Sequence, residues 1–410
     1  MTKSVLRKYA KLIVQMGVNI KKGQGAVILA DTAQSEIALM VAEEAYRAGA
    51  KWVDIRWTNQ DLDKMRYKKE SVKVLSATQE WEKARMQYEL DELPVRIWID
   101  SDDPDGLKGV NVEKMQKANL ARMKVRKPYR DAMENKYQWT IVAVPSAKWA
   151  KKVFPDLAES EAMDKLWEAI FQAVRITGDG RCVDKWHRHI ETLAHRVEKL
   201  NQLNFKSLHY TNSLGTDLTV ELPEDHIWEA GNDVTLSGRT YIANIPTEEV
   251  FTSPLKTGVN GVVYSALPLS HNGTIIDKFH FVVKDGKIVE VHAEQGEEAL
   301  KAAVTVDEGA SYFGEVALVP YDSPISNQKI LFYNTLFDEN AACHIAFGEA
   351  YPCLKDGQAM SKDELKARGL NDSITHVDFM VGTPDLNILG ITHDGKEIPV
   401  FVDGNFAPEI

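Results

Sequence analysis

The chain has 410 residues, of which 44% are hydrophobic, and this length predicts two domains with sizeable cores. Sixty acidic residues against 49 basic ones give a net charge of −11, which argues against a general nucleic-acid or anionic-membrane binder. No run of roughly 18 apolar residues predicts a membrane span, and no apolar run near the start predicts a secretory signal. Three sparse cysteines do not form a disulfide framework, so we expect a reducing, cytoplasmic compartment: Cys182, Cys343 and Cys353.

The first half of the sequence alternates between helical and strand-like patterns. Apolar residues at helical spacing predict a helix over 4–16 that ends at Gly17. A strand-like run at 25–30, an Ala-rich helix at 31–49 and a second strand at 51–57 form a βαβ unit, which predicts a parallel sheet. Further helices are predicted at 70–92, 160–173 and 183–203, and further strands at 95–100 and 138–145.

Several features of this half invite a functional interpretation, but we favour a structural one for each. Gly23 and Gly25 lack the third glycine of a dinucleotide site and precede their strand. The basic stretch 114–130 is typical of a solvated helix face, and the acidic loop 101–106 of a turn. Three histidines have no acidic partner at ligand spacing and are interpreted as solvated or hydrogen-bonded: His187, His189 and His195.

The second half contains turn signals that are typical of a β-protein. Four hairpin-type dipeptides lie near β-prone residues: Asn272-Gly273, Asp285-Gly286, Asp394-Gly395 and Asp403-Gly404. A helix is predicted at 295–304. We therefore expect an α/β domain with a parallel sheet at 1–203 and a mainly antiparallel, β-rich domain at 204–410.

The segment 337–351 places three acids, a thiol, an imidazole and a phenol among small and apolar residues. Its pattern predicts a packed helix that ends before Pro352, with His344, Gly348 and Tyr351 on one face. Glu339 is off that face unless it lies in the turn that leads into the helix.

Three further segments carry ionisable residues in apolar surroundings. The run 373–382 alternates as a strand, so His376 and Asp378 share one face and are expected to be buried with partners. Glu315 is the only charge in 314–320. Glu248 and Glu249 point to opposite sides if the chain is extended there, so only one of them faces a common site.

Four sequence blocks together resemble the aminopeptidase T and aminopeptidase S family of thermophilic-type metallopeptidases, peptidase family M29: Pro-Thr-Glu-Glu-Val-Phe-Thr, Gly-Glu-Val-Ala-Leu-Val-Pro, Glu-Asn-Ala-Ala-Cys-His-Ile-Ala-Phe-Gly and His-Val-Asp. The blocks follow the family's order, and the resemblance extends over the whole chain. It implies that six residues form the metal site: Glu249, Glu315, Glu339, His344, His376 and Asp378. It also implies that Glu315 bridges two ions, that Tyr351 borders the site, and that the protein is a homodimer acting on short peptides. All four blocks fall in 204–410, so the resemblance places metal binding and the chemistry in that domain and gives 1–203 the role of shaping a substrate cavity.

These residue types suit a pair of divalent ions. Carboxylates bridge and neutralise two nearby cations, and imidazoles add affinity for zinc or cobalt. A carboxylate-rich set also tolerates magnesium or manganese. The expected reaction is release of N-terminal residues by a metal-activated water, in which a phenol at Tyr351 donates a hydrogen bond to the oxyanion.

Some assignments stay open at this point. His376 is either a direct ligand or a proton-transfer residue, and Glu248 is a possible proton relay only if its backbone is not a regular strand. Cys343 is interpreted as a core residue, because His344 beside it points elsewhere. Another dinuclear hydrolase, such as a dipeptidase or small-amide amidohydrolase, is the first alternative function, and a non-catalytic binding protein is the second.

Overall fold

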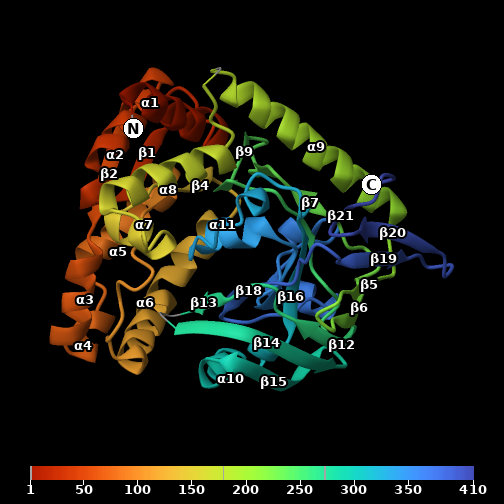
Figure 1. The fold of residues 1–410 in the computed structure, drawn as a ribbon. Helices are drawn as coiled ribbons and strands as arrows, with labels where there is room; N and C mark the ends of the chain where they lie inside the picture. Colours follow the sequence, from red (N-terminus) through yellow and green to blue (C-terminus); the bar gives the residue numbers. More distant parts are fainter. Residues whose placement is uncertain (1, 179, 272–273) are drawn as a thin grey trace. The chain divides into compact units, whose positions relative to one another are not determined.

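The computed structural model describes residues 2–178, 180–271 and 274–410. The chain forms two compact units (Figure 1), and each is described separately below. Unit 1 comprises Met1–Trp186 and Asn232–Pro246, and unit 2 comprises His187–Gly231 and Thr247–Ile410. Helix α9 (Cys182–Leu203) ends at residue 203, where the sequence predicted the division, whereas the units divide after Trp186, so most of α9 belongs to unit 2.

Unit 1 is built on a five-stranded parallel sheet in the order β10-β4-β3-β1-β2. The strands are β1 (Gly25–Asp31), β2 (Trp52–Thr58), β3 (Val95–Asp100), β4 (Trp139–Ala143) and β10 (Asn244–Ile245), and a separate pair is formed by β8 (Asp233–Val234) and β9 (Thr240–Tyr241). The helices are α1 (Lys3–Leu12), α2 (Ser35–Arg47), α3 (Gln60–Lys69), α4 (Val72–Ser76), α5 (Glu80–Glu92), α6 (Val112–Met133), α7 (Ala147–Val153) and α8 (Glu159–Ala173). The predicted βαβ unit is thus confirmed as β1, α2 and β2.

The predicted single helix over 70–92 is wrong, because two helices occupy that stretch. Helix α4 ends before Ala77, whose backbone is extended with ψ of 132°. A new helix, α5, then begins after Gln79, where Gln79 and Glu82 form a capping box. Helices α3 and α7 are additional to those predicted. The basic stretch lies on α6, where exposed Lys117 pairs with Glu113 one turn away, as expected for a solvated helix face.

Unit 2 consists of two antiparallel sheets. The first is a five-stranded sheet in the order β18-β17-β16-β11-β7, formed by β7 (Glu229–Ala230), β11 (Val250–Thr252), β16 (Phe313–Leu318), β17 (His344–Gly348) and β18 (His376–Met380). The second has nine strands, β5 (Ser207–Thr211), β6 (Asp217–Glu221), β12 (Val259–Tyr264), β13 (Leu269–His271), β14 (Thr274–Lys284), β15 (Lys287–Gln295), β19 (Asn387–Ile391), β20 (Glu397–Val402) and β21 (Asn405–Phe406). The short helices of unit 2 are α10 (Glu297–Ala303), α11 (Thr335–Asp338) and α12 (Lys362–Ala367). The expected fold class, parallel sheet first and antiparallel sheets second, is confirmed.

Three of the predicted hairpin dipeptides connect neighbouring strands. Asp285-Gly286 joins β14 to β15, Asp394-Gly395 joins β19 to β20, and Asp403-Gly404 joins β20 to β21. Asn272-Gly273 lies outside the described residues.

The predicted helix over 337–351 is also wrong. The chain instead makes the short helix α11, a 3₁₀ turn at Glu339–Ala341, and then strand β17. All five residues of β17 are buried, so the apolar residues cover both faces and show no strand alternation. His344, Gly348 and Tyr351 therefore do not share a helix face.

The core of unit 2 lies between its two sheets. Phe281 of β14 packs against Phe313, Phe347 and Phe379, with ring centroids 6.3, 5.9 and 5.2 Å away. These three phenylalanines come from β16, β17 and β18, so one face of the five-stranded sheet packs into the core.

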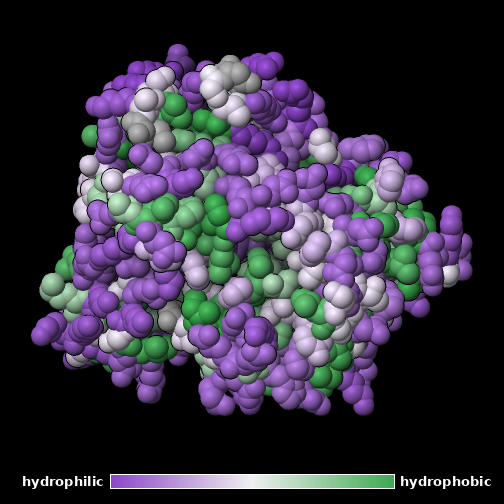
Figure 2. All heavy atoms as spheres, viewed as in Figure 1, coloured by the Kyte–Doolittle hydropathy of each residue, from purple (hydrophilic) through white to green (hydrophobic). Residues whose placement is uncertain are grey.

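On the surface, the face in Figure 2 is mostly hydrophilic with scattered hydrophobic patches. Over the described residues, no helix is long and apolar enough to cross a membrane.

Candidate metal centre

The face of the five-stranded sheet opposite the core carries the predicted site residues. In β18, Val377 and Phe379 belong to the core cluster, so the alternate residues His376 and Asp378 project from the other face. In β17, Ile345 and Phe347 belong to the core in the same way, which places His344 opposite. The strand prediction for 373–382 is confirmed, and it accounts for the shared direction of His376 and Asp378.

A β-bulge aims Glu315 at this face. Phe313 pairs with Phe347 on the core side, and regular pairing would then place residue 315 on the core side too. The register shifts between Phe313 and Glu315, so that Glu315 pairs with Ala346 and changes faces. Gly314 allows the bulge, because a Cβ there would lie 2.2 Å from the carbonyl oxygen of Glu349.

The strand register leaves space between the acids. Ala346 of β17 is the partner of Glu315 on one side and of Asp378 on the other. The two carboxylates therefore flank a methyl group in one row across three strands. A larger side chain at position 346 would fill the space that the carboxylates border.

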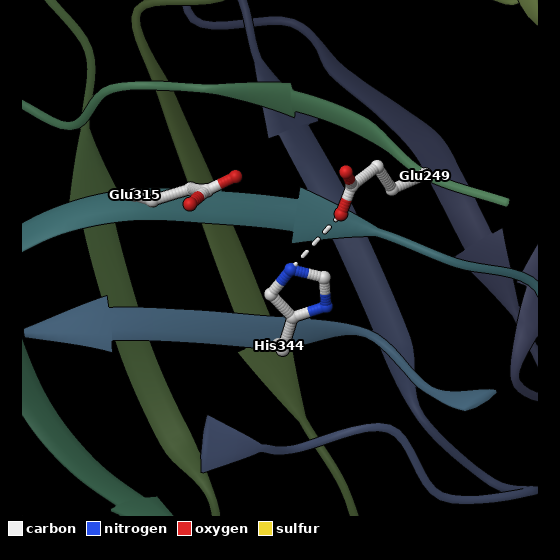
Figure 3. Close-up of side chains that lie close together, drawn as sticks. All are labelled: Glu249, Glu315 and His344. Carbon is white, nitrogen blue, oxygen red and sulfur yellow. Dashed lines mark ion pairs between the residues drawn. The ribbon is translucent and has the colours of Figure 1, made fainter. Parts of the chain in front are cut away.

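One group of possible ligands consists of Glu249, Glu315 and His344. Each offers one donor atom, and these atoms lie within 4.8 Å of one another. Glu249 immediately precedes β11, and its Oε2 is 3.1 Å from Nε2 of His344. Figure 3 shows these two side chains pointing at each other, with the Glu315 carboxylate on the same side of the sheet.

A second group of the same kind consists of Glu315, His376 and Asp378. Nε2 of His376 lies 3.0 Å from Oε2 of Glu315 and 3.3 Å from Oδ1 of Asp378. Glu315 belongs to both groups. The sheet therefore brings five of the six predicted metal residues into two overlapping sets that share one carboxylate.

Backbone carbonyls orient both imidazoles. Nδ1 of His376 is 2.8 Å from the carbonyl oxygen of Glu349, and Nδ1 of His344 is 3.2 Å from that of Ala342. A carbonyl only accepts, so each Nδ1 carries the proton and Nε2 is directed at the carboxylates. This is the arrangement of metal-binding histidines, whose second nitrogen donates to a fixed acceptor.

The raised pKa values of the two histidines reflect the negative charge of the acids around them. Burial alone would lower the pKa of His344, but the contact with Glu249 outweighs it and raises that pKa to about 10. The pKa of His376 is also raised, because Asp378 and Glu315 outweigh its burial. Burial raises the pKa of Glu315, and His376 opposes that shift. Without a cation, the imidazolium protons neutralise the carboxylates.

Glu339 and Tyr351 border the two groups. Burial, followed by repulsion from Asp378 and Glu249, raises the pKa of Glu339 well above its usual range. Tyr351 lies after β17, and its ring centroid is 5.0 Å from that of His376 and 5.6 Å from that of Phe251. Tyr351 is 44% exposed overall, yet burial of the phenol and repulsion from Glu315 raise its pKa, so the hydroxyl keeps its proton.

The carboxylate of Glu248 has a different neighbour from that of Glu249. Its Oε2 lies 3.7 Å from Nε2 of His189 on α9, and that nitrogen is 2.7 Å from the carbonyl oxygen of Thr247. His189 is thus hydrogen-bonded, as expected, but its acidic neighbour was missed. The backbone at Glu248 is not in a strand.

The donor chemistry fits divalent metal ions. Glu249, Glu315, Glu339 and Asp378 supply four carboxylates against two imidazoles, and in the described parts of the chain no lysine or arginine pairs with any of the four. Oδ1 of Asp378 is buried and accepts no hydrogen bond from the described residues. Such an excess of buried negative charge costs several kcal/mol per uncompensated ion. Oxygen and imidazole donors in two sets match a pair of divalent cations.

Two contributors escaped the sequence analysis. The first is Asn340, which is fully buried. Only its acidic neighbour Glu339 was predicted from the sequence to belong to the site. The Glu349 carbonyl that holds His376 is a backbone atom, so no residue type signals it. Cys343 behaves as predicted: burial raises its pKa to about 12, and its thiol lies 3.3 Å from the carbonyl of Val319.

The chain is similar to known metalloproteases and aminopeptidases over almost its whole length. The family model described as thermophilic metalloprotease (M29) matches residues 2–406. Aminopeptidase AmpS of Bacillus subtilis is 45% identical over 404 residues, covering 98% of both chains. Aminopeptidase 2 of Geobacillus stearothermophilus is 43% identical, covering 99% of this chain and 98% of its own.

Solved structures extend the agreement to the fold. Wild-type AmpT from Thermus thermophilus superposes with a TM-score of 0.90 at 38% identity, over 99% of each chain. A 2,5-dihydroxypyridine dioxygenase from Pseudomonas putida KT2440 shares only the fold, with a TM-score of 0.53 at 10% identity over 100% of this chain and 98% of its own. On the family match and the full-length identity, the chain belongs to the thermophilic metalloprotease family M29.

Proposed function

We propose that this protein is a metal-dependent aminopeptidase that releases N-terminal residues from short peptides, with two divalent cations in the metal centre. The observation that carries the proposal is the pair of three-residue groups that share Glu315. The aminopeptidase names of the full-length relatives support the choice of reaction.

Each side chain of the centre has a defined place in this proposal. Glu249 and His344 would hold one ion, His376 and Asp378 would hold the other, and Glu315, which belongs to both groups, would be shared between them, with Glu339 at the border. Bound divalent ions would supply Lewis-acid polarisation of the peptide carbonyl and a water of lowered pKa. The carbonyl contacts of the two histidines keep both Nε2 atoms aimed at the carboxylates before substrate arrives.

Tyr351 is proposed to stabilise the transition state. Its raised pKa keeps the phenol protonated, so it can donate a hydrogen bond to the developing oxyanion. Its ring contact with His376 places it at the border of the second group. His376 remains a candidate for proton transfer as well as for ligation.

The excess of carboxylates is proposed to select a free amino terminus. A protonated α-amino group brings positive charge to a site with four acids, whereas an acetylated terminus brings none. Glu248 is the proposed proton relay, acting together with His189, which lies 3.7 Å from its carboxylate.

The remaining assignments rest on the resemblance and on composition. We propose zinc, cobalt, magnesium or manganese as the ions, a homodimer as the assembly, and unit 1 as the part that shapes the substrate cavity. The three cysteines are buried and form no disulfide with one another, which supports the cytoplasm as the compartment.

Chelation followed by metal restoration tests the reaction. Activity on amino-acyl p-nitroanilides should vanish with chelator and return with cobalt, zinc, magnesium or manganese, and N-acetylation of the substrate should abolish it. Metal-dependent cleavage of the acetylated substrate would instead favour the amidohydrolase alternative. Activity indifferent to chelation would overturn the metal centre. In the same assay, E249A should lose turnover while its circular dichroism spectrum stays native.

A further inference from the structure

Two of the acids at the metal centre are not held by strand hydrogen bonds. Glu315, His344, His376 and Asp378 lie within β16, β17 and β18, where the sheet ladder fixes their backbones. Glu249 precedes β11, and Glu339 lies in the 3₁₀ turn before β17. Something other than the ladder must therefore position these two carboxylates.

The segments that carry them reach the same edge of the sheet. Strand β16 runs antiparallel to both β11 and β17, so β11 and β17 are parallel and begin at the same end. Val250 of β11 pairs with Leu318, and His344 of β17 pairs with the adjacent Ala317. Because β16 separates the two strands, no ladder bond joins β11 to β17.

The side chain of Asn340 spans this gap. Its Oδ1 accepts a hydrogen bond of 2.7 Å from the backbone N–H of Glu248, the residue before Glu249. Its Nδ2 donates to the carbonyl of Leu336 at 3.0 Å and to Oε1 of Glu339 at 3.4 Å. Asn340 has no exposed surface, so these contacts exclude water.

Only an amide of this length meets the requirements of the position. A backbone N–H needs an acceptor, and a carbonyl and a carboxylate need donors. Aspartate in its charged form supplies no donor and would repel Glu339, whereas leucine would leave all three groups unsatisfied in a buried place. The directions of the three partners also fix which end of the amide is oxygen.

We infer that Asn340 is a positioning residue, which through one buried amide sets the placement of both Glu249 and Glu339 at the metal centre. The inference rests on the proposed metal-dependent function and deepens it. Asn340 does not itself contact the metal or the substrate. It fixes the two acids that the strands leave free, much as carbonyls fix the two histidines.

The test measures metal binding and not only activity. Metal-free wild type, N340A and N201A are titrated with Co²⁺ and followed by d–d absorption and calorimetry, and melting temperatures are recorded. Asn201 is the control, because its amide makes two hydrogen bonds, to the backbone N–H and carbonyl of Trp228, and neither bond involves a residue of the metal centre. We expect Co²⁺ affinity to fall ~10-fold or more in N340A, with an altered spectrum, and to stay at the wild-type value in N201A.

The outcomes separate the inference from the proposed function. Wild-type affinity and spectrum in N340A would overturn the positioning role, and so would an equal loss in N201A at equal melting temperature. A wild type that binds no Co²⁺ would overturn the metal centre itself. If N340A fails to fold, N340S, which retains a small polar group, is titrated under the same criteria. With restored metal, the kcat of N340A should fall, because the displaced acids act on the reacting centre, and KM should rise as well, because the same acids are proposed to attract the α-amino group of the substrate.

Discussion

Two acid-rich regions of this protein differ in what surrounds the carboxylates. In unit 1, Asp102 is exposed, and partial desolvation followed by repulsion from Asp100 and Asp31 raises its pKa to about 6. Lysines balance this region, since Lys148 lies 2.9 Å from Asp61 and Lys152 2.9 Å from Asp105. At the metal centre of unit 2, Glu249 and Glu315 are buried, Glu339 and Asp378 are partly buried, and the nearest cations are imidazoles.

This contrast separates an acidic surface from a metal centre. For the described residues, both groups with three ligand side chains within 4.8 Å lie in unit 2. The number of acids is similar in the two regions, so it does not distinguish them. Three features do distinguish the metal centre. Its acids are less exposed, their partners are imidazoles, and no lysine or arginine among the described residues pairs with them. Together these features leave an excess of negative charge that solvent screens poorly.

The largest effect is expected when a change in the neighbouring backbone moves one acid out of the metal centre and leaves its side chain intact. In G314A, the new Cβ would lie 2.2 Å from the Glu349 carbonyl oxygen, so the bulge that aims Glu315 cannot persist. We expect turnover to fall roughly a thousandfold or more, with lost Co²⁺ binding and a lower melting temperature. The control G178A adds a Cβ where no atom lies within 4 Å. Normal Co²⁺ binding by G314A would contradict the role of the bulge.

A smaller effect is expected at the border of the buried group. Y351F removes the phenolic hydroxyl, which burial and the nearby carboxylates keep protonated because they raise its pKa. We expect kcat to fall on the order of 10²-fold, with Co²⁺ affinity within a factor of about three of wild type, because the phenol acts on the oxyanion and not on the ions. Steady-state kinetics and the Co²⁺ titration measure the two quantities. Unchanged kcat would remove Tyr351 from the mechanism.

The thiol in the core should matter only for stability. Cys343 belongs to the core cluster, and its raised pKa of about 12 keeps it a neutral thiol. C343A should therefore retain turnover and lose about 1 kcal/mol of stability from the vacated volume. Urea unfolding and the p-nitroanilide assay decide this. An inactive but folded C343A enzyme would restore the cysteine nucleophile.

The smallest effect is expected in the exposed acidic region. The pKa of Asp102 is raised in the folded state, so its charged form destabilises the protein above about pH 6, and this penalty disappears below about pH 4. D102N should increase stability at neutral pH by less than about 1 kcal/mol, since the group is exposed, and leave it unchanged in acid. Thermal melts across pH measure this difference. A loss of Co²⁺ binding in D102N would contradict the distinction between the two regions.

The sequence predicted the architecture better than the local structure of the site. The βαβ unit and the hairpins follow from periodicity and from Gly-containing turns, which are local signals. The segment 337–351 misled because a strand buried on both faces shows the same run of apolar residues as a buried helix. The break at Ala77 was missed because a capping box inside a long helical pattern is a weak signal.

The acids and histidines were identified because they lie in sequence blocks that resemble the family. That resemblance does not depend on the secondary structure that the blocks adopt. What the sequence could not show is how they are aimed. The bulge at Gly314 depends on pairing with β17, and the bond from Asn340 to Glu248 joins residues 92 positions apart. Such features arise only when distant segments meet.

The central claim is that the two overlapping groups hold two ions that share Glu315. The most direct measurement is the Co²⁺ stoichiometry of the metal-free protein, from calorimetry and elemental analysis, for wild type and E315Q. We predict two ions per chain for wild type and a loss of tight binding at both positions in E315Q. One ion per chain in wild type, or two tightly bound ions in E315Q, would contradict the shared centre.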